Sequence, residues 1–154
     1  GDGSFSDISE MAGIQGPKNG NGDCAIAFDY DNDGDLDIVT ANGFGPWPTR
    51  FGPFHLFQNN MPSQGNFLQI DLKGTVSNKQ AWGTRVTVEA NGQITYFQKT
   101  ALNGSLSASD LPLHIGLGKA TMANEIKVWW PSGKETILSD VEHGQILKIV
   151  EPGE

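Results

Sequence analysis

The feature that most constrains this chain is an acidic stretch, residues 29–37, in which five aspartates fall within nine residues. Carboxylates packed this densely repel one another, so the stretch resists ordering unless a cation neutralises it. Calcium suits it best, because this hard cation takes about six to eight oxygen ligands. Gly34 permits the sharp turn that wraps the chain around an ion. We therefore expect one calcium ion here, bound by the side chains of Asp29, Asp31, Asp33 and Asp37 and by the backbone carbonyl of Asp35.

The flanks of this acidic loop indicate strands rather than helices. The loop begins like a helix–loop–helix calcium site, whose glycine occupies the sixth position, but the glutamate that closes such a site is replaced by Thr40. Residues 24–28 and 36–41 are short, apolar and partly β-branched, which is typical of strands. We expect a compact loop between two strands, closed by Asp37. The alternative is a solvated acidic turn that holds no ion.

Charge and hydropathy narrow the classes of partner. The formal net charge of −8 over 154 residues argues against nucleic acid or an anionic membrane surface as partner. No apolar run approaches the length of a bilayer span, so no membrane insertion is expected. The abrupt start at Gly1, without a signal peptide, indicates a piece of a longer mature protein. A calcium site suits a secreted or cell-surface location, where calcium is plentiful.

Short strands separated by turn residues continue to the end of the chain. Residues 67–73 and 85–90 alternate apolar and polar side chains, and Asn91-Gly92 is a strong hairpin signal. No stretch sustains a helical period. We predict an all-β fold: an antiparallel β-sandwich over residues 65–154, preceded by a calcium-binding, propeller-blade-like β segment over residues 1–64.

Cys24 alternates with Ile26 and Phe28 and is expected in a core. The predicted sandwich core is Leu68, Ile70, Leu72, Val86, Val88, Leu113, Ile115, Leu117, Ile126, Val128, Leu147 and Ile149.

Two regions resemble known families. Residues 23–60, with the acidic loop and the closing Leu-Phe-Gln-Asn-Asn, resemble an FG-GAP (VCBS) repeat. Residues 66–151 resemble an ASPIC/UnbV domain through Ser77-Asn78 and residues 113–118, 130–133 and 145–147. The first resemblance implies calcium in a blade loop and further repeats upstream, since one blade cannot close a propeller. Residues 81–84 and 102–106 depart from the usual ASPIC/UnbV pattern.

Catalytic signatures are missing from the sequence. His55, His114 and His143 are far apart and lack the spacing of zinc ligands. There is no nucleophile elbow, no phosphate-binding glycine loop and no recognisable pair of glycosidase carboxylates. A structural role is favoured for His114. We expect a non-catalytic protein, and a hydrolytic domain with unrecognised residues is the weaker alternative.

Aromatic side chains beside cations are the candidate ligand-binding residues. Residues 42–54 form a Gly- and Pro-rich loop after the acidic stretch, and loops on rigid scaffolds often carry binding. Strand alternation directs Trp130 to the core and Trp129 outward with Lys127. The alternative is that these rings are covered by neighbouring segments. The candidates are Trp47, Arg50, Phe51, Trp82, Lys127 and Trp129.

These observations predict a calcium-stabilised extracellular recognition module. A glycan is favoured over an extracellular protein as ligand, because the strand patterns show no large apolar patch. The alternative is a structural or adhesive protein-interaction fragment of a larger propeller-containing secreted protein.

Overall fold

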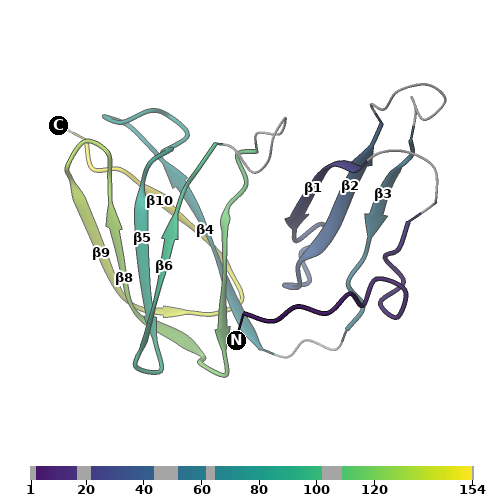
Figure 1. Ribbon diagram of the computed structural model, residues 1–154. Coiled ribbons are helices and arrows are strands. Elements are labelled where there is room, and N and C mark those ends of the chain that lie inside the picture. Colours follow the sequence, from purple (N-terminus) through teal and green to yellow (C-terminus); the bar gives the residue numbers. More distant parts are fainter. Residues whose placement is uncertain (1–2, 17–21, 44–51, 62–64, 102–108, 154) are drawn as a thin grey trace.

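The computed structural model describes residues 3–16, 22–43, 52–61, 65–101 and 109–153, and these ranges contain ten strands and no helix. The all-β prediction is therefore confirmed. No helix within the described ranges is long and apolar enough to cross a membrane. Figure 1 shows β1, β2 and β3 on one side of the molecule, with the other strands grouped opposite them.

The N-terminal sheet has three antiparallel strands that flank the acidic loop. They are β1 (Gly22–Phe28), β2 (Asp37–Asn42) and β3 (Phe54–Phe57), in that spatial order. The acidic loop connects β1 to β2, and the pair Phe28↔Asp37 closes it. A loop between two strands was the arrangement expected from the flanking sequences.

The remaining strands form two sheets. One sheet, ordered β10-β4-β7, contains β4 (Asn66–Lys73), β7 (Leu113–Gly118) and β10 (Ile146–Val150). The other, ordered β6-β5-β8-β9, contains β5 (Arg85–Ala90), β6 (Gln93–Gln98), β8 (Met122–Trp129) and β9 (Glu135–Glu142). The hairpin of β5 and β6 turns at Asn91 and Gly92, which have φ of 50° and 71°, as a type I′ turn requires.

One buried cluster joins the two sheets, as a sandwich requires. It includes Leu68 and Ile70 from β4 and Val86, Ile126 and Val128 from the opposing sheet, each at most 1% exposed. All predicted core residues are buried except Leu113 and Leu147, which are partly buried and pack against the cluster. Trp130 is also buried, as predicted, and its Nε1 donates a hydrogen bond to Thr136 Oγ1 at 2.9 Å.

One strand pair departs from the antiparallel expectation. β10 lies beside β4 in parallel register, with Leu147 opposite Ile70 and Ile149 opposite Leu72. The chain crosses from β9 in one sheet to β10 in the other, so no hairpin dictates the direction of β10. The parallel register still directs Ile149 into the core, so the apolar alternation is satisfied.

The N-terminal sheet has no comparable core. None of the described residues before Leu68 is a buried hydrophobic residue. Phe5 and Met11 are largely exposed, and Cys24 is only half-buried, so the expectation of a core cysteine was wrong. The described residues form no buried layer against this three-stranded sheet, which leaves such a side chain partly open to solvent.

This difference predicts unequal autonomy of the two parts. Residues 65–154 expressed alone will fold cooperatively, because both inner sheet faces are buried against each other. Residues 1–64 alone will not, because their sheet keeps exposed edges and an uncovered face. Proton NMR of the separate halves, compared with the whole chain, tests this. A dispersed spectrum from the N-terminal half would contradict the prediction.

Candidate functional site

The acidic loop brings three carboxylates together. Asp29, Asp31 and Asp37 each offer an oxygen, and these oxygens lie within 4.8 Å of one another. Asp37 is 1% exposed, and its two oxygens accept backbone N–H bonds from Asn59 (2.7 Å) and Tyr30 (2.9 Å). These bonds tie the end of β3 to the acidic loop and fix the Asp37 carboxylate in place.

Asp29 provides the observation that bears most directly on a cation. Its Oδ2 accepts hydrogen bonds from Gly34 N (3.1 Å) and Gln69 Nε2 (2.8 Å). Its Oδ1 is buried and has no hydrogen-bond partner among the described residues. A buried carboxylate oxygen without a donor is costly unless a cation or water meets it. The oxygen-only donor set and this unsatisfied atom fit calcium.

Of the other two predicted ligands, the Asp33 carboxylate lies outside this cluster, and the backbone carbonyl predicted for Asp35 stays a prediction. The three-carboxylate group does not include Asp33, whose Oδ1 accepts a hydrogen bond from Asp35 N at 2.9 Å. Asp31 accepts hydrogen bonds from Asp33 N (3.3 Å) and Gln58 Nε2 (2.6 Å). The structure therefore gathers Asp29, Asp31 and Asp37 most closely.

The acidic loop packs against the sandwich. Gly34 has a φ of +96°, and a Cβ there would lie 2.1 Å from the Phe67 ring, so only glycine fits. Phe67 stacks on His114, with ring centroids 5.5 Å apart. Burial lowers the pKa of His114 below its usual value, although nearby Asp29 and Asp35 oppose the shift. The loop thus lies over β4 and β7, a contact that its own sequence does not predict.

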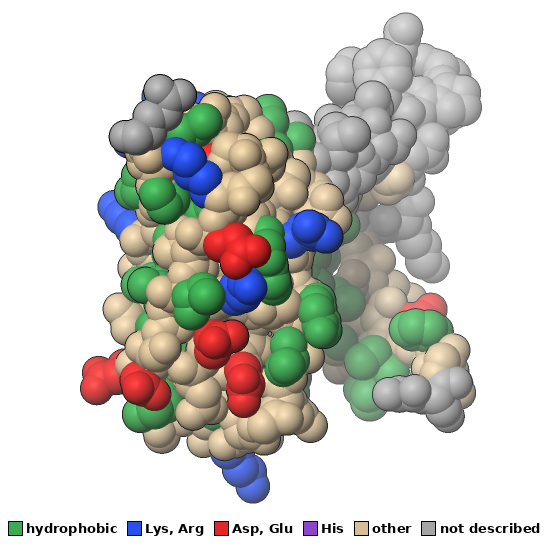
Figure 2. Space-filling view, turned by 90° about the vertical axis from the view of Figure 1, so that its left-hand side faces the viewer, with side chains coloured by type: hydrophobic (Ala, Val, Ile, Leu, Met, Phe, Trp, Pro, Cys, Tyr) green, Lys and Arg blue, Asp and Glu red, His purple; other side chains and the backbone are tan. Residues whose placement is uncertain are grey.

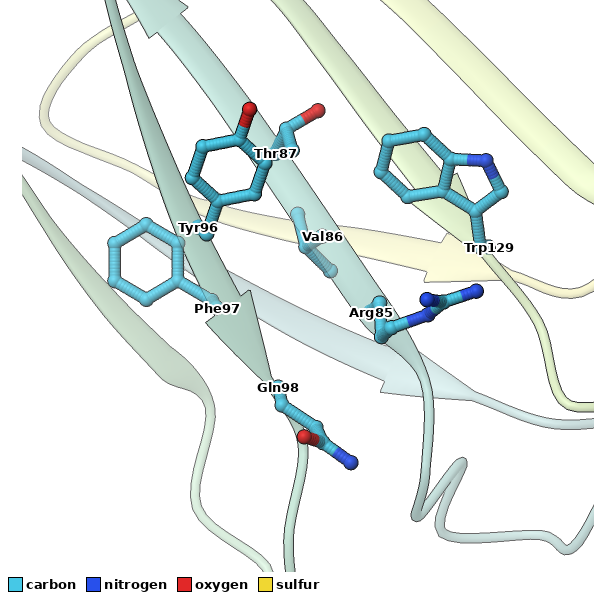
Figure 3. A pocket seen from close by; sticks show the side chains of 7 residues that line it. All are labelled: Arg85, Val86, Thr87, Tyr96, Phe97, Gln98 and Trp129. Carbon is cyan, nitrogen blue, oxygen red and sulfur yellow. The ribbon is translucent and has the colours of Figure 1, made fainter.

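A second feature is a groove of about 630 Å³ on the outer face of the four-stranded sheet. Val86 and Val128 point into the core, so alternate residues on the same strands point outward. The groove spans β6, β5 and β8, and Figure 3 shows the Tyr96 and Trp129 rings on either side of Thr87. Its outward-facing residues are Arg85, Thr87, Tyr96, Gln98 and Trp129.

The two rings differ in accessibility. Tyr96 is 77% exposed, whereas Trp129 is half-buried. Lys127 Nζ lies 4.9 Å from the centroid of the Trp129 ring and also pairs with Glu135 Oε2 at 2.9 Å. This ion pair and cation–π contact hold the indole in place and cover one of its faces. Tyr96 therefore offers the more open ring face.

Of the other predicted ligand-binding residues, only Trp82 and Lys127 lie within the described part of the chain, and neither lines this groove. Trp47, Arg50 and Phe51 lie outside the described residues. Trp82 is 36% exposed and does not line the groove. The Asn78 side chain makes two hydrogen bonds with the Trp82 backbone. Asn78 Oδ1 accepts a bond from Trp82 N, and Asn78 Nδ2 donates one to Trp82 O, each at 2.8 Å.

Sequence reasoning missed Tyr96 and Arg85 as candidates. The hairpin register places Tyr96 opposite Thr87 and Gln98 opposite Arg85. The Asn91-Gly92 turn, combined with strand alternation, was the signal that could have placed Tyr96 on the outward face.

A buried carboxylate near the C-terminus forms a separate polar network. Glu151 is 2% exposed. Its Oε2 accepts the consecutive backbone N–H groups of Thr75, Val76 and Ser77 at 2.7–2.8 Å. Its Oε1 accepts the hydroxyls of Ser77 (2.7 Å) and Ser132 (2.5 Å). This network joins the loop after β4, the turn before β9 and the segment after β10.

A family comparison identifies the region that contains this network. The family model for ASPIC and UnbV matches residues 74–154, which is more than half of the chain. The chain belongs to the ASPIC and UnbV family. In this ASPIC and UnbV region, Ser77 and Ser132, from two of the four resemblance motifs, both donate hydrogen bonds to the Glu151 carboxylate. These two motifs therefore share a structural contact within the domain.

A similarity to a curated protein extends beyond this region. The chain is 26% identical over 140 residues to cartilage acidic protein 1 of Homo sapiens, and the match covers 86% of this chain. It covers 19% of the human protein, so the chain spans about a fifth of that relative. The alignment is longer than the family match and includes part of the segment before the ASPIC and UnbV region. The resemblance of residues 23–60 to an FG-GAP repeat stays a prediction.

Proposed function

We propose that this chain is a calcium-stabilised, non-catalytic recognition module that binds a carbohydrate in the groove of the outer sheet face. The observation that carries the proposal is the pairing of Tyr96 and Trp129 with polar side chains on a rigid sheet. Aromatic rings present flat apolar faces of the kind that pack on sugar rings. Arg85, Thr87 and Gln98 supply hydrogen-bonding groups between and beside them.

The surface supports a glycan over a protein as ligand. On the face shown in Figure 2, hydrophobic side chains are scattered among acidic and basic ones, and the described residues there form no continuous apolar patch. Protein-binding surfaces usually have a desolvated apolar centre. A shallow groove with separate rings and polar groups suits a hydroxylated ligand better.

An extracellular location completes the proposal. The similar human protein is named for cartilage and for its acidity, and the present chain is also acidic, with a net charge of −8. The acidic loop would be occupied by calcium where that ion is abundant. Bound calcium would neutralise the three gathered carboxylates and hold the N-terminal sheet to β4 through Asp29 and Gln69.

The substitutions Tyr96→Ala and Trp129→Ala test the groove. Each will weaken binding of an oligosaccharide about fivefold, the effect of losing a stacking contact of about 1 kcal/mol. We expect the larger loss for Tyr96→Ala, because Lys127 already covers one face of Trp129. Calorimetry against a panel of neutral and acidic oligosaccharides, at fixed calcium, provides the measurement.

The matched control is Ile94→Ala, which removes an exposed apolar side chain from the same strand, outside the groove. Its affinity should match that of the parent protein. If a glycan binds and both ring substitutions leave its affinity within twofold, the groove is not the binding site.

The second candidate function is structural adhesion, and the uncovered N-terminal sheet favours it. Ile8, Met11, Leu36 and Met61 line an open apolar depression of about 750 Å³, and each is at least 40% exposed. If residues 23–60 are one FG-GAP blade, neighbouring blades would cover these side chains. Absence of glycan binding, together with self-association through this face, would favour this function.

A further inference from the structure

Two cations, Lys127 beside the groove and Arg85 within its lining, differ in their ion-pair partners. Lys127 is paired with Glu135 at 2.9 Å. Arg85 is exposed, and no carboxylate in the described ranges forms an ion pair with it. Register places Arg85 directly opposite Trp129 on one side and Gln98 on the other. The Arg85 guanidinium, which has no ion-pair partner among the described residues, therefore belongs to the central residue of the row Gln98, Arg85, Trp129.

We infer that the groove takes an acidic saccharide, whose carboxylate or sulfate group pairs with Arg85 while a sugar ring stacks on Tyr96. This inference rests on the proposed carbohydrate-binding function and specifies its ligand. A guanidinium presents a planar fork of donors that matches a carboxylate or sulfate in two parallel hydrogen bonds. Such a pair selects an acidic sugar over a neutral one of the same shape.

The spacing of the sheet suits this arrangement. Tyr96 lies opposite Thr87, two residues along β5 from Arg85, and alternate residues on a strand are about 7 Å apart. A hexose ring over Tyr96 would therefore bring its charged substituent toward the Arg85 row. The groove volume of about 630 Å³ lies within the range of about 300–1,000 Å³ typical of small-molecule sites.

The acidity of the whole chain does not prevent an anionic ligand from binding. On the outer face, Glu89 and Glu125 have no ion-pair partner among the described residues and lie opposite each other. Glu89 is four residues along β5 from Arg85, or about 13 Å. That distance exceeds the Debye length of about 8 Å at physiological ionic strength. Their repulsion is screened at the guanidinium, and the Glu135 charge is balanced by Lys127.

The test compares three probes with one backbone. They are a short β-1,4-linked glucose oligomer, the same oligomer oxidised to glucuronate at C6, and the same oligomer sulfated at C6. Calorimetry at one fixed calcium concentration measures their affinities. We expect an acidic probe to bind about tenfold more tightly than the neutral one, as a charge-assisted hydrogen-bond pair predicts. The two acidic probes distinguish a carboxylate from a sulfate ligand.

Substitutions at Arg85 test whether this residue causes the preference for the acidic probe. Arg85→Gln will remove the advantage of the acidic probe, so that the variant binds the acidic and neutral probes with affinities within about twofold of each other. Arg85→Lys will retain part of the advantage, because lysine keeps the charge but loses the fork. The control Lys148→Gln removes the same charge from an exposed position on β10, in the other sheet, and should change nothing. Amide shift changes in labelled protein should centre on Arg85, Thr87 and Tyr96.

The possible results distinguish failure of the acidic-ligand inference from failure of the proposed carbohydrate-binding function. If neutral and acidic probes bind equally and Tyr96→Ala weakens both, the acidic specificity is wrong and the carbohydrate site remains. If Arg85→Gln leaves the acidic advantage intact, Arg85 is not the recognition residue and the inference is overturned. If none of the probes binds, both the inference and the proposed carbohydrate function fail.

Discussion

Removal of calcium will lower the melting temperature of this protein by about 5–10 °C. The physical basis is mass action: an ion that binds only the folded state stabilises it by about 2.7 kcal/mol at a hundredfold excess over its Kd. For a chain of this size, each kcal/mol shifts the melting temperature by about 2–4 °C. The gathered carboxylates of Asp29, Asp31 and Asp37 and the unsatisfied Asp29 Oδ1 motivate the expectation.

Calorimetric scans of chelated and calcium-loaded protein provide the measurement. Asp31→Asn is the best single variant, because Asp31 is exposed and its loss disturbs the apo fold little. This variant should show a reduced calcium shift. Asp37→Asn will lower the melting temperature even without calcium, because the Asp37 carboxylate also accepts the N–H groups of Tyr30 and Asn59.

Asp7→Asn is the matched control for these variants. Asp7 is an exposed acid outside the acidic loop, and its carboxylate bonds only to neighbouring Ser9 among the described residues. It should keep the full calcium shift. Identical melting temperatures for chelated and calcium-loaded parent protein would show that the acidic loop holds no stabilising ion.

Loss of the Glu151 carboxylate will destabilise the sandwich by about 2–4 kcal/mol, because hydrogen bonds to charged groups contribute strongly and their buried partners would be left unsatisfied. Glu151→Ala leaves the N–H groups of Thr75, Val76 and Ser77 without their acceptor. Urea unfolding of the parent and the variant measures the change. Glu142→Ala, at an exposed position on β9, is the control and should fall within about 0.5 kcal/mol of the parent.

The Glu151 network also predicts a pH dependence. Burial opposes ionisation of Glu151, but hydrogen bonds from Ser132, Ser77 and Thr75 outweigh it and lower its pKa from 4.5 to about 2. Because the folded state binds this proton less tightly than the unfolded state, the carboxylate stabilises the fold fully above pH 4.5. That contribution is lost as pH falls from 4.5 to about 2.

The parent protein and Glu151→Gln should therefore converge in stability as pH falls through this window. Glutamine keeps the shape of the side chain but cannot ionise, so its own stability lacks this component of the pH dependence. A difference in unfolding free energy that stays constant across the window would contradict the lowered pKa.

Local patterns in the sequence predicted the all-β fold and the direction in which several strand side chains point. The Asn91-Gly92 turn, with positive φ at both residues, defined the hairpin from two adjacent positions. Alternation along β8 predicted that Trp130 is buried and that Lys127 and Trp129 share the opposite direction. The acidic loop was recognisable because its charge density and its glycine are encoded within nine consecutive residues.

Contacts between distant residues were decided only by the tertiary structure. Glu151 meets Thr75 across 76 positions of the chain, and Asp29 meets Gln69 across 40. The groove exists because β5 pairs with both β6 and β8, which places Arg85 between Gln98 and Trp129. Strand alternation specifies which way a side chain points but not which strand lies beside it. That choice, and the parallel placement of β10 beside β4, depends on how two apolar faces pack around one shared core.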